Sequence, residues 1–157
     1  METELSVRTV GPADIEYVEG LLAANDLPTA DISELMDHLY VFETDGERIG
    51  VGGLEPYADV GLLRSVAIED ACRGQGYGSA VCRRLLAVAR QAELSTVYLL
   101  TTTAEEFFAR LGFEVVDRTA VPHAIRQTRE FSDLCPTTAV CMRRGVPADP
   151  VVEASVE

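Results

Sequence analysis

Hydrophobic positions recur along the chain with two spacings, and together they predict an alternation of strands and helices. Residues 4–9 alternate between polar and apolar side chains, which is the period of a strand. Apolar residues at helical spacing over 15–22 predict a helix that follows the Gly11-Pro12 turn. The same patterns predict further strands at 39–44, 48–55, 60–69, 96–101, 113–118 and 137–143, and helical segments at 31–36, from about 80 to 93 and at 104–111. The stretch at 121–134 is helical or irregular.

The order of these predicted elements sets the fold class. It reads β-α-α-β-β-β-α-β-α-β-β, which is neither a strict βα alternation nor an all-β pattern. Turn signals at Asp45-Gly46 and at 56–59 predict an antiparallel meander. We therefore predict an α/β (α+β) fold with a mixed, mostly antiparallel sheet of about seven strands and helices on both faces. One domain is expected over 1–144, followed by a mobile tail over 145–157 that has no periodic pattern.

Acidic residues outnumber basic ones by 26 to 13, and all 13 bases are Arg, for a formal net charge of −13. Such a surface repels the phosphates of nucleic acid and the anionic face of membranes, so neither is expected as a partner. It suits a protein that stays soluble in concentrated salt, which makes a halophilic source one hypothesis; an acidic protein of an ordinary high-GC organism is the alternative. The acidic N-terminus and the lack of a long apolar stretch predict a cytoplasmic protein without a signal peptide.

The four cysteines do not have the spacing of a metal site. None forms a C-x-x-C pair, and the two histidines, His38 and His123, are far apart in the sequence. We therefore expect no metal, and free thiols in a reducing compartment.

The segment 73–79, Arg-Gly-Gln-Gly-Tyr-Gly-Ser, follows a predicted strand and opens a predicted helix. A helix N-terminus offers unpaired N–H groups and the positive end of the helix dipole, and glycines let the backbone approach an anion, so the segment predicts a phosphate or pyrophosphate cradle. A Walker loop needs a Lys, which the chain lacks, and a dinucleotide fingerprint needs G-x-G-x-x-G, whereas this spacing is G-x-G-x-G. The alternative is a glycine loop that only turns a strand into a helix.

Arg73, Gly76 and Gly78 form the pattern R-x-x-G-x-G, and with the motifs on either side they resemble the GNAT acetyltransferases. Residues 63–68, Leu-Arg-Ser-Val-Ala-Ile, resemble the strand that pairs with pantetheine in that family. Residues 105–113 resemble its late helix, which ends in Leu-Gly-Phe. The resemblance implies the GNAT fold and acetyl-CoA as the acyl donor.

The resemblance also implies which residues hold the donor. The amides of the cradle would bind the coenzyme A pyrophosphate, and the pantetheine arm would enter where the strand at 66–68 diverges from the strand at 96–101. A backbone N–H near Val66 or Ala67 would polarise the thioester carbonyl while the amine attacks directly, with no acyl-enzyme. The implied cofactor-binding residues are Val66, Ala67, Ile68, Arg73, Gly74, Gln75, Gly76, Tyr77, Gly78, Ser79 and Phe108, and Val66 is also an implied catalytic residue.

The chain departs from the family pattern in the late helix. Many members carry a Tyr there that donates a proton to the leaving thiolate, whereas the matching pair in this chain is Phe107-Phe108. Four alternatives stay open: the thiolate departs without such a donor, Tyr57 supplies the proton, a water supplies it, or the chain has lost catalysis.

Glu55 is the expected catalytic base, because it ends a predicted strand beside the cleft that the resemblance implies. A solvated strand-end carboxylate is the alternative interpretation of Glu55. Glu69 and Asp70 end the next strand and are expected to be loop charges, and Glu130 is a further candidate for the base.

Arg64, Arg126 and Arg129 are expected to bind an oxyanion on the acceptor, since planar guanidinium groups match carboxylate, phosphate or arsonate. The alternative for each is a surface or structural ion pair. Residues 63–65 and 101–105 and the segment from Arg126 to Pro136 resemble the GNAT subfamily associated with arsenic-resistance operons.

Three functions follow from this interpretation. The first is N-acetylation of a small amine or amino-acid-like substrate, with a link to arsenic resistance as a hypothesis. The second is acetylation of a protein or peptide, because the acidic surface of this chain would attract a basic peptide. The third is a non-catalytic acyl-CoA-binding module. Dimers are common in the family, so a homodimer is one expectation for the assembly.

Overall fold

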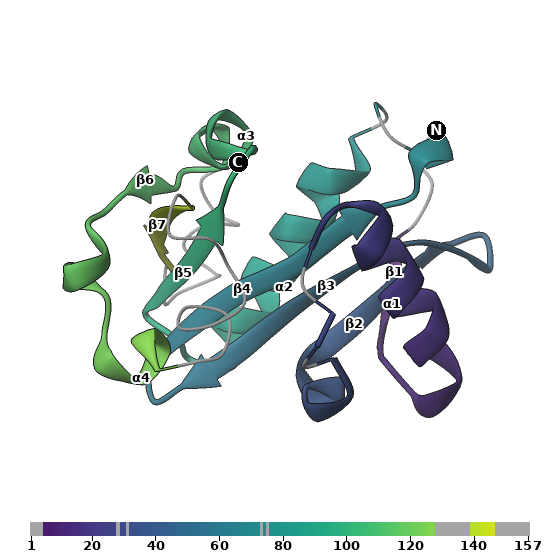
Figure 1. Ribbon diagram of the computed structural model, residues 1–157, viewed down its shortest axis with the longest axis horizontal. Helices are drawn as coiled ribbons and strands as arrows, with labels where there is room; N and C mark the ends of the chain where they lie inside the picture. Colours follow the sequence, from purple (N-terminus) through teal and green to yellow (C-terminus); the bar gives the residue numbers. More distant parts are fainter. Residues whose placement is uncertain are drawn as a thin grey trace, which may run out of the picture.

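The computed structural model describes residues 5–27, 29–30, 32–72, 74, 76–127 and 139–146, which form a seven-stranded sheet with helices on both faces (Figure 1). The strands are β1 (Ser6–Thr9), β2 (Leu39–Thr44), β3 (Glu47–Tyr57), β4 (Val60–Ile68), β5 (Thr96–Thr101), β6 (Glu114–Val115) and β7 (Val140–Gly145). The α-helices are α1 (Ile15–Ala24), α2 (Tyr77–Gln91), α3 (Glu105–Arg110) and α4 (His123–Arg126), and the 3₁₀ turns include η2 (Ile32–Glu34), η3 (Met36–His38) and η4 (Asp70–Cys72). The predicted mixed sheet with helices on both faces is confirmed.

The strands follow the order β1-β2-β3-β4-β5-β7-β6 across the sheet, and β4 with β5 is its one parallel pair. β2, β3 and β4 form the meander that the turn signals predict. β4 then leads through α2 to β5, and such a crossover connection is what parallel neighbours require. The sheet therefore has two antiparallel parts that meet at a parallel seam between β4 and β5.

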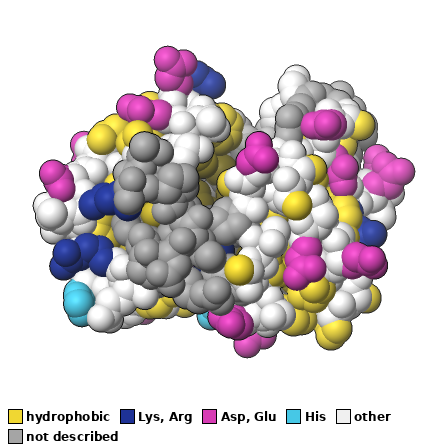
Figure 2. All heavy atoms as spheres, in the orientation of Figure 1, with side chains coloured by type: hydrophobic (Ala, Val, Ile, Leu, Met, Phe, Trp, Pro, Cys, Tyr) yellow, Lys and Arg dark blue, Asp and Glu magenta, His cyan; other side chains and the backbone are white. Residues whose placement is uncertain are grey.

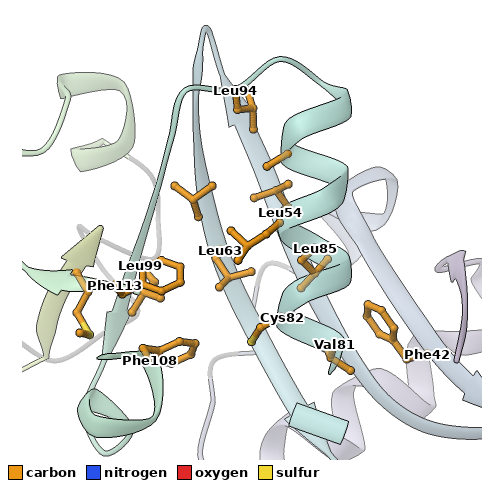
Figure 3. Close-up of a cluster of buried hydrophobic side chains, with 14 of the residues drawn as sticks. Phe42, Leu54, Leu63, Val81, Cys82, Leu85, Leu94, Leu99, Phe108 and Phe113 are labelled. Atoms are coloured by element: carbon orange, nitrogen blue, oxygen red, sulfur yellow. The ribbon is translucent and has the colours of Figure 1, made fainter. Parts of the chain in front are cut away.

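The helix α2 covers one face of the sheet (Figure 3). Gly52 of β3 lets the helix approach closely, because a Cβ at this position would lie 2.7 Å from Leu85 Cδ1. A larger residue would displace α2 from the sheet or force Leu85 out of its place. The buried cluster between α2 and the sheet contains Phe42, Ile49, Leu54, Leu63, Val81, Cys82, Leu85, Leu86, Ala89, Leu94, Val97, Leu99, Phe108, Phe113 and Met142.

The opposite face is covered at two separate places. The first cluster packs α1 and η2 on β2, β3 and β4, and it ends on β4 at Ala67. The second packs α4 and the residues before it on β4, β5 and β7, and on β4 it contains Leu62. Arg64 lies two residues beyond Leu62 and therefore on the same face, between the two clusters. A polar site thus interrupts the apolar cover of this face.

Two strand boundaries differ from the prediction in the middle of the chain. The β3–β4 turn is confined to residues 58–59, because Pro56 and Tyr57 stay paired with β4. The strand expected over 113–118 is reduced to Glu114–Val115. It stops early because the Asp117 side chain accepts a hydrogen bond from Thr119 N and caps a 3₁₀ turn instead.

The last strand also starts later than expected, at Val140 instead of about 137, and it extends to Gly145. Val146 then donates to Ser95 O at 2.9 Å, so the described structure continues to Gly145 and Val146, past the expected end of the domain at residue 144. Residues 147–157, most of the expected tail, lie outside the described residues.

Charges are unevenly distributed over the surface. Figure 2 shows Asp and Glu side chains densest over the part that Figure 1 labels α1 and β2, whereas Arg and His gather on the side of β6 and α4. Among the described helices, none combines the length and apolar character that a bilayer crossing requires.

Candidate active site

The segment predicted to cradle an anion lies at the N-terminus of α2. Gly76 precedes the helix with a left-handed backbone (φ +84°), and Gly74 is left-handed as well (φ +80°). Among the described residues no side chain caps this end of α2, and its first turn carries no acidic residue. Because the first N–H groups of a helix have no acceptor within the helix, the amides of residues 77–79 point the positive end of the dipole toward solvent. This geometry suits a phosphate group.

The glycines of the cradle have different causes. A Cβ at Gly76 would meet no atom within 4 Å, so only its left-handed backbone calls for glycine there. At Gly78 a Cβ would lie 3.4 Å from Phe107 Cζ, so this glycine leaves room for the ring. The other two expected members of the cradle, Arg73 and Gln75, lie outside the described residues.

The strands β4 and β5 separate close to the cradle. Their parallel pairing covers only Val60, Gly61 and Leu62 of β4, although β4 continues to Ile68 and β5 to Thr101. Beyond Leu62 no described strand pairs with β4 on the side that faces β5, so β4 has a strand edge there inside the protein. Figure 2 shows the surface hollowed between α3 and the segment that leads into α2, above this separation. The divergence has the form that the resemblance implies for residues 66–68.

A β-bulge lies on β4 at the start of this edge. Val51 of β3 pairs with Ala67 and Gly53 pairs with Arg64, so β4 has one more residue than β3 between the two pairs. The extra residue falls at Ser65-Val66, and Ser65 has a left-handed backbone (φ +60°). A bulge leaves one residue outside the ladder, which can free an N–H donor for a ligand at the position where Val66 is expected to act.

Glu55 lies on β3 and is buried, with 6% of its surface exposed. Tyr57 Oη donates to Glu55 Oε2 at 3.0 Å, and Arg64 Nη1 contacts Glu55 Oε1 at 3.4 Å. Arg64 is itself 3% exposed, and its Nε donates to Ser65 Oγ at 3.1 Å. The interpretation of Glu55 as a solvated strand-end carboxylate is therefore wrong: it belongs to a buried network in the gap between the two apolar clusters.

The two phenylalanines of α3 have different environments. Phe108 is buried in the core with Phe113, and the ring centroids lie 5.7 Å apart in an edge-on arrangement (Figure 3). Phe107 is only partly buried and lies against Gly78 at the start of α2. Sequence reasoning assigned the cofactor contact to Phe108, but the structure brings Phe107 to the cradle.

The remaining predicted residues are dispersed. Arg126 is exposed on α4, and Arg129 and Glu130 lie outside the described residues. Glu69 is partly buried and Asp70 exposed, in the connection between β4 and α2. Of the two predicted acceptor-binding arginines that the structure describes, Arg64 lies in the network with Glu55 and Arg126 is exposed on α4.

The described thiols have the character of packed side chains. Burial raises the pKa of Cys82 to about 12 and that of Cys141 to about 11, while Cys72 is partly buried. Within the described residues there is no group of three or more His, Cys, Asp or Glu side chains that could hold a metal ion.

Comparison with known proteins places this geometry in a family. The model of the GNAT acetyltransferase domain matches residues 36–115, which is half of the chain and extends from η3 to β6. The chain belongs to the GNAT acetyltransferase family. The matched residues include the bulge, the separation of β4 from β5, and the N-terminus of α2.

The curated relatives of this GNAT chain include amino-acid acetyltransferases. One from Mycobacterium tuberculosis is 38% identical over 91 residues, which are 57% of this chain and 49% of the relative. One from Escherichia coli K12 is 28% identical over 98 residues, 61% of this chain and 22% of the relative. The GNAT chain thus corresponds to about half of the first relative's length and to about a fifth of the second's.

Two solved structures have the same fold. A Mycobacterium tuberculosis protein in complex with CoA and the ligand NLQ superposes with a TM-score of 0.76 at 28% identity, covering 90% of this chain and 99% of that one. The N-acetylglutamate synthase of Neisseria gonorrhoeae, with coenzyme A and L-arginine, has a TM-score of 0.78 at 21% identity, covering 92% and 34%. The GNAT fold is therefore shown over almost the whole chain.

Sequence reasoning missed two members of the buried network. Tyr57 was considered only as a proton donor to the thiolate, although its spacing of two from Glu55 on a strand puts both side chains on one face. Ser65 has no signal in the sequence, because nothing in Leu-Arg-Ser-Val-Ala-Ile predicts that the strand bulges there.

Proposed function

We propose that this GNAT domain transfers an acetyl group from acetyl-CoA to the amino group of an amino acid or a similar small zwitterion. The observation that carries the proposal is the separation of β4 from β5 in the part of β4 that leads into α2, whose N-terminus no described side chain caps. Its amino-acid acetyltransferase relatives, and the CoA present in two proteins of the same fold, support it.

The residues present fit acetyl-CoA. The pyrophosphate needs donors and positive potential, which the amides of Tyr77, Gly78 and Ser79 and the dipole of α2 supply. The pantetheine arm carries two amide groups, and the edge of β4 beyond its pairing with β5 offers main-chain groups that can pair with them as a neighbouring strand would. Phe107 beside Gly78 provides an apolar surface at the entrance. The acetyl-CoA thioester supplies the activated acyl group, and no metal is needed.

The proposed reaction divides between two parts of the chain. The amine forms a bond to the thioester carbon, the C–S bond breaks and the sulfur leaves as a thiolate, and the second proton that the nitrogen loses ends on that sulfur to give the CoA thiol. The N–H freed by the bulge at Val66 stabilises the negative charge that develops on the carbonyl oxygen. Glu55 accepts a proton from the ammonium group, directly or through a water, so that the nitrogen lone pair can attack. Phe108 has no hydroxyl, so the late helix gives no proton to the thiolate.

We propose that Arg64 sets the acceptor class. A buried guanidinium next to a carboxylate can face both charges of a zwitterion: Glu55 attracts the ammonium group, and Arg64 attracts the acceptor carboxylate. Arg126 on α4 and Arg129 are further candidates for that carboxylate. An amino-acid-like organoarsenical has the same ammonium group with an arsenic oxyanion, so it fits the same pair; this is the acceptor suggested by the resemblance to arsenic-operon members.

The experiment is a thiol-release assay with acetyl-CoA and a panel of acceptors in low and high KCl. The panel contains the twenty amino acids, amino-acid-like arsenicals and phosphinates, the matching amines without an anionic group, and short peptides. Turnover with zwitterions but not with their decarboxylated amines is expected. Turnover with peptides alone would replace the proposal by peptide acetylation. Binding of CoA without turnover of any acceptor would leave a non-catalytic acyl-CoA-binding module.

A further inference from the structure

Ser65 combines two features that rarely occur together. It is buried within a strand, with 7% of its surface exposed, and its backbone is left-handed at φ +60°. Left-handed backbone favours glycine, because a Cβ then crowds the following carbonyl. Strained non-glycine residues of this kind concentrate at functional sites. Since glycine would satisfy the backbone with less strain, the serine side chain is expected to have a task of its own.

The side chain of Ser65 has a defined partner. Its Oγ accepts a hydrogen bond from Arg64 Nε at 3.1 Å. Arg64 Nη1 in turn contacts Glu55 Oε1 at 3.4 Å, and Glu55 Oε2 receives the hydroxyl of Tyr57 at 3.0 Å. These contacts connect the bulge to the carboxylate in one continuous chain. They are nearly closed to solvent, since the side chains of Arg64 and Glu55 are 1% and 8% exposed.

We propose that Ser65 is a positioning residue that fixes the bulge and the Arg64–Glu55 pair relative to each other. The proposal rests on the proposed function, in which the bulge binds the carbonyl oxygen and Glu55 accepts the proton. Both groups must act on the same carbon–nitrogen pair, and small errors in such placement are costly in rate. The hydrogen bond from Arg64 holds residue 65 left-handed, which directs the N–H that follows it. The same bond turns the guanidinium toward Glu55.

The test replaces Ser65 by glycine, which removes Oγ and also relieves the backbone. A residue with only a structural role would give a variant whose activity follows its stability. A positioning role predicts that Ser65→Gly melts at or above the wild-type temperature while kcat falls by about tenfold or more and KM for acetyl-CoA stays within about twofold.

A matched control comes from Glu93, an exposed residue after α2 that is also left-handed (φ +63°). Glu93→Gly should leave kcat unchanged, because it relieves similar strain away from the site. Ser65→Ala removes the same hydroxyl and carries the same expected loss of kcat if the glycine variant does not fold. Wild-type turnover together with unchanged kcat in Ser65→Gly would refute the positioning role alone. A wild-type protein that binds CoA but acetylates no acceptor would refute the proposed function and this role with it.

Discussion

Gly76 offers a quantitative test of the anion cradle. A Cβ at this position has no neighbour within 4 Å, so side chains of different length fit into the space without displacing other groups. Its left-handed φ of +84° makes any replacement strained. The informative comparison is therefore Gly76→Glu against Gly76→Gln, because the two variants share the strain and almost the same volume and differ by one negative charge.

The size of the charge effect follows from Coulomb's law. A carboxylate about 6 Å from one phosphate charge is repelled by about 0.7 kcal/mol in bulk water and by about 2.8 kcal/mol at the effective dielectric of a protein surface. Those energies correspond to roughly 3-fold and 100-fold weaker binding of CoA. The backbone strain shared by both variants is about 1 to 2 kcal/mol and should lower both melting temperatures equally.

The assay is calorimetric titration of CoA into wild type and both variants at 50 mM and at 500 mM KCl, with melting curves as the stability control. Gly76→Glu should bind CoA more weakly than Gly76→Gln, and the difference should shrink in high salt because screening shortens the reach of the charge. Equal dissociation constants for two folded variants at low salt would show that no phosphate lies near the N-terminus of α2, and the interpretation of the cradle would fail.

Three further predictions concern other parts of the molecule. Glu55→Gln should lower kcat at neutral pH by about 10² or more, with a smaller loss at high pH where the amine is already deprotonated, whereas the control Tyr57→Phe should lose less; an unchanged pH profile of kcat would remove Glu55 as proton acceptor. Asp14 accepts from Arg8 at 2.7 and 2.9 Å, and this side-chain bond lowers the pKa of Asp14 from 3.8 to about 2. Its ionised form therefore stabilises the fold above pH 3.8, and the contribution, about 1 to 2 kcal/mol, is lost as the pH falls toward 2. Urea unfolding should show Asp14→Asn less stable at pH 7 and equal to wild type near pH 2, and equal stability at pH 7 would contradict this linkage. If the acidic composition is an adaptation to salt, the melting temperature should rise as KCl is raised to molar concentrations, and a maximum in dilute buffer would count against it.

Much of the fold was predictable because strand and helix periods are strong in this chain. The meander of β2, β3 and β4 follows from alternating runs separated by turn residues, and α2 follows from apolar residues at helical spacing. Boundaries were less predictable where a local polar bond competes with strand pairing. Asp117 illustrates this, since its hydrogen bond with Thr119 ends β6 three or more residues before the pattern does.

The part of the candidate site that is formed by main-chain groups was predictable from the sequence, whereas the part formed by side chains from different strands was less so. The cradle is predictable because a left-handed backbone requires glycine, which is visible in the sequence, and because the start of a helix exposes its first amides. Phe107 and Phe108 were not distinguishable in this way. They are adjacent and of the same type, so only the orientation of α3 in the structure decides which ring faces the core and which faces the cradle. The bulge at Ser65 arises from the pairing of β4 with β3, which no single segment encodes.

The parallel seam explains why donor and acceptor would meet at one place. Because β4 is followed by α2, the N-terminus of that helix lies at the carboxyl end of β4, which is where open sheets with parallel strands bind their ligands. β4 keeps β3 on one side, but on the other side no described strand pairs with it after Leu62. A ligand anchored by phosphate at α2 that follows this side of β4 reaches the bulge with its other end. The buried network that contains Glu55 lies on the face of the sheet opposite α2. The bulge on β4 is therefore the point where a donor anchored at the cradle and an acceptor beside the Glu55 carboxylate can meet.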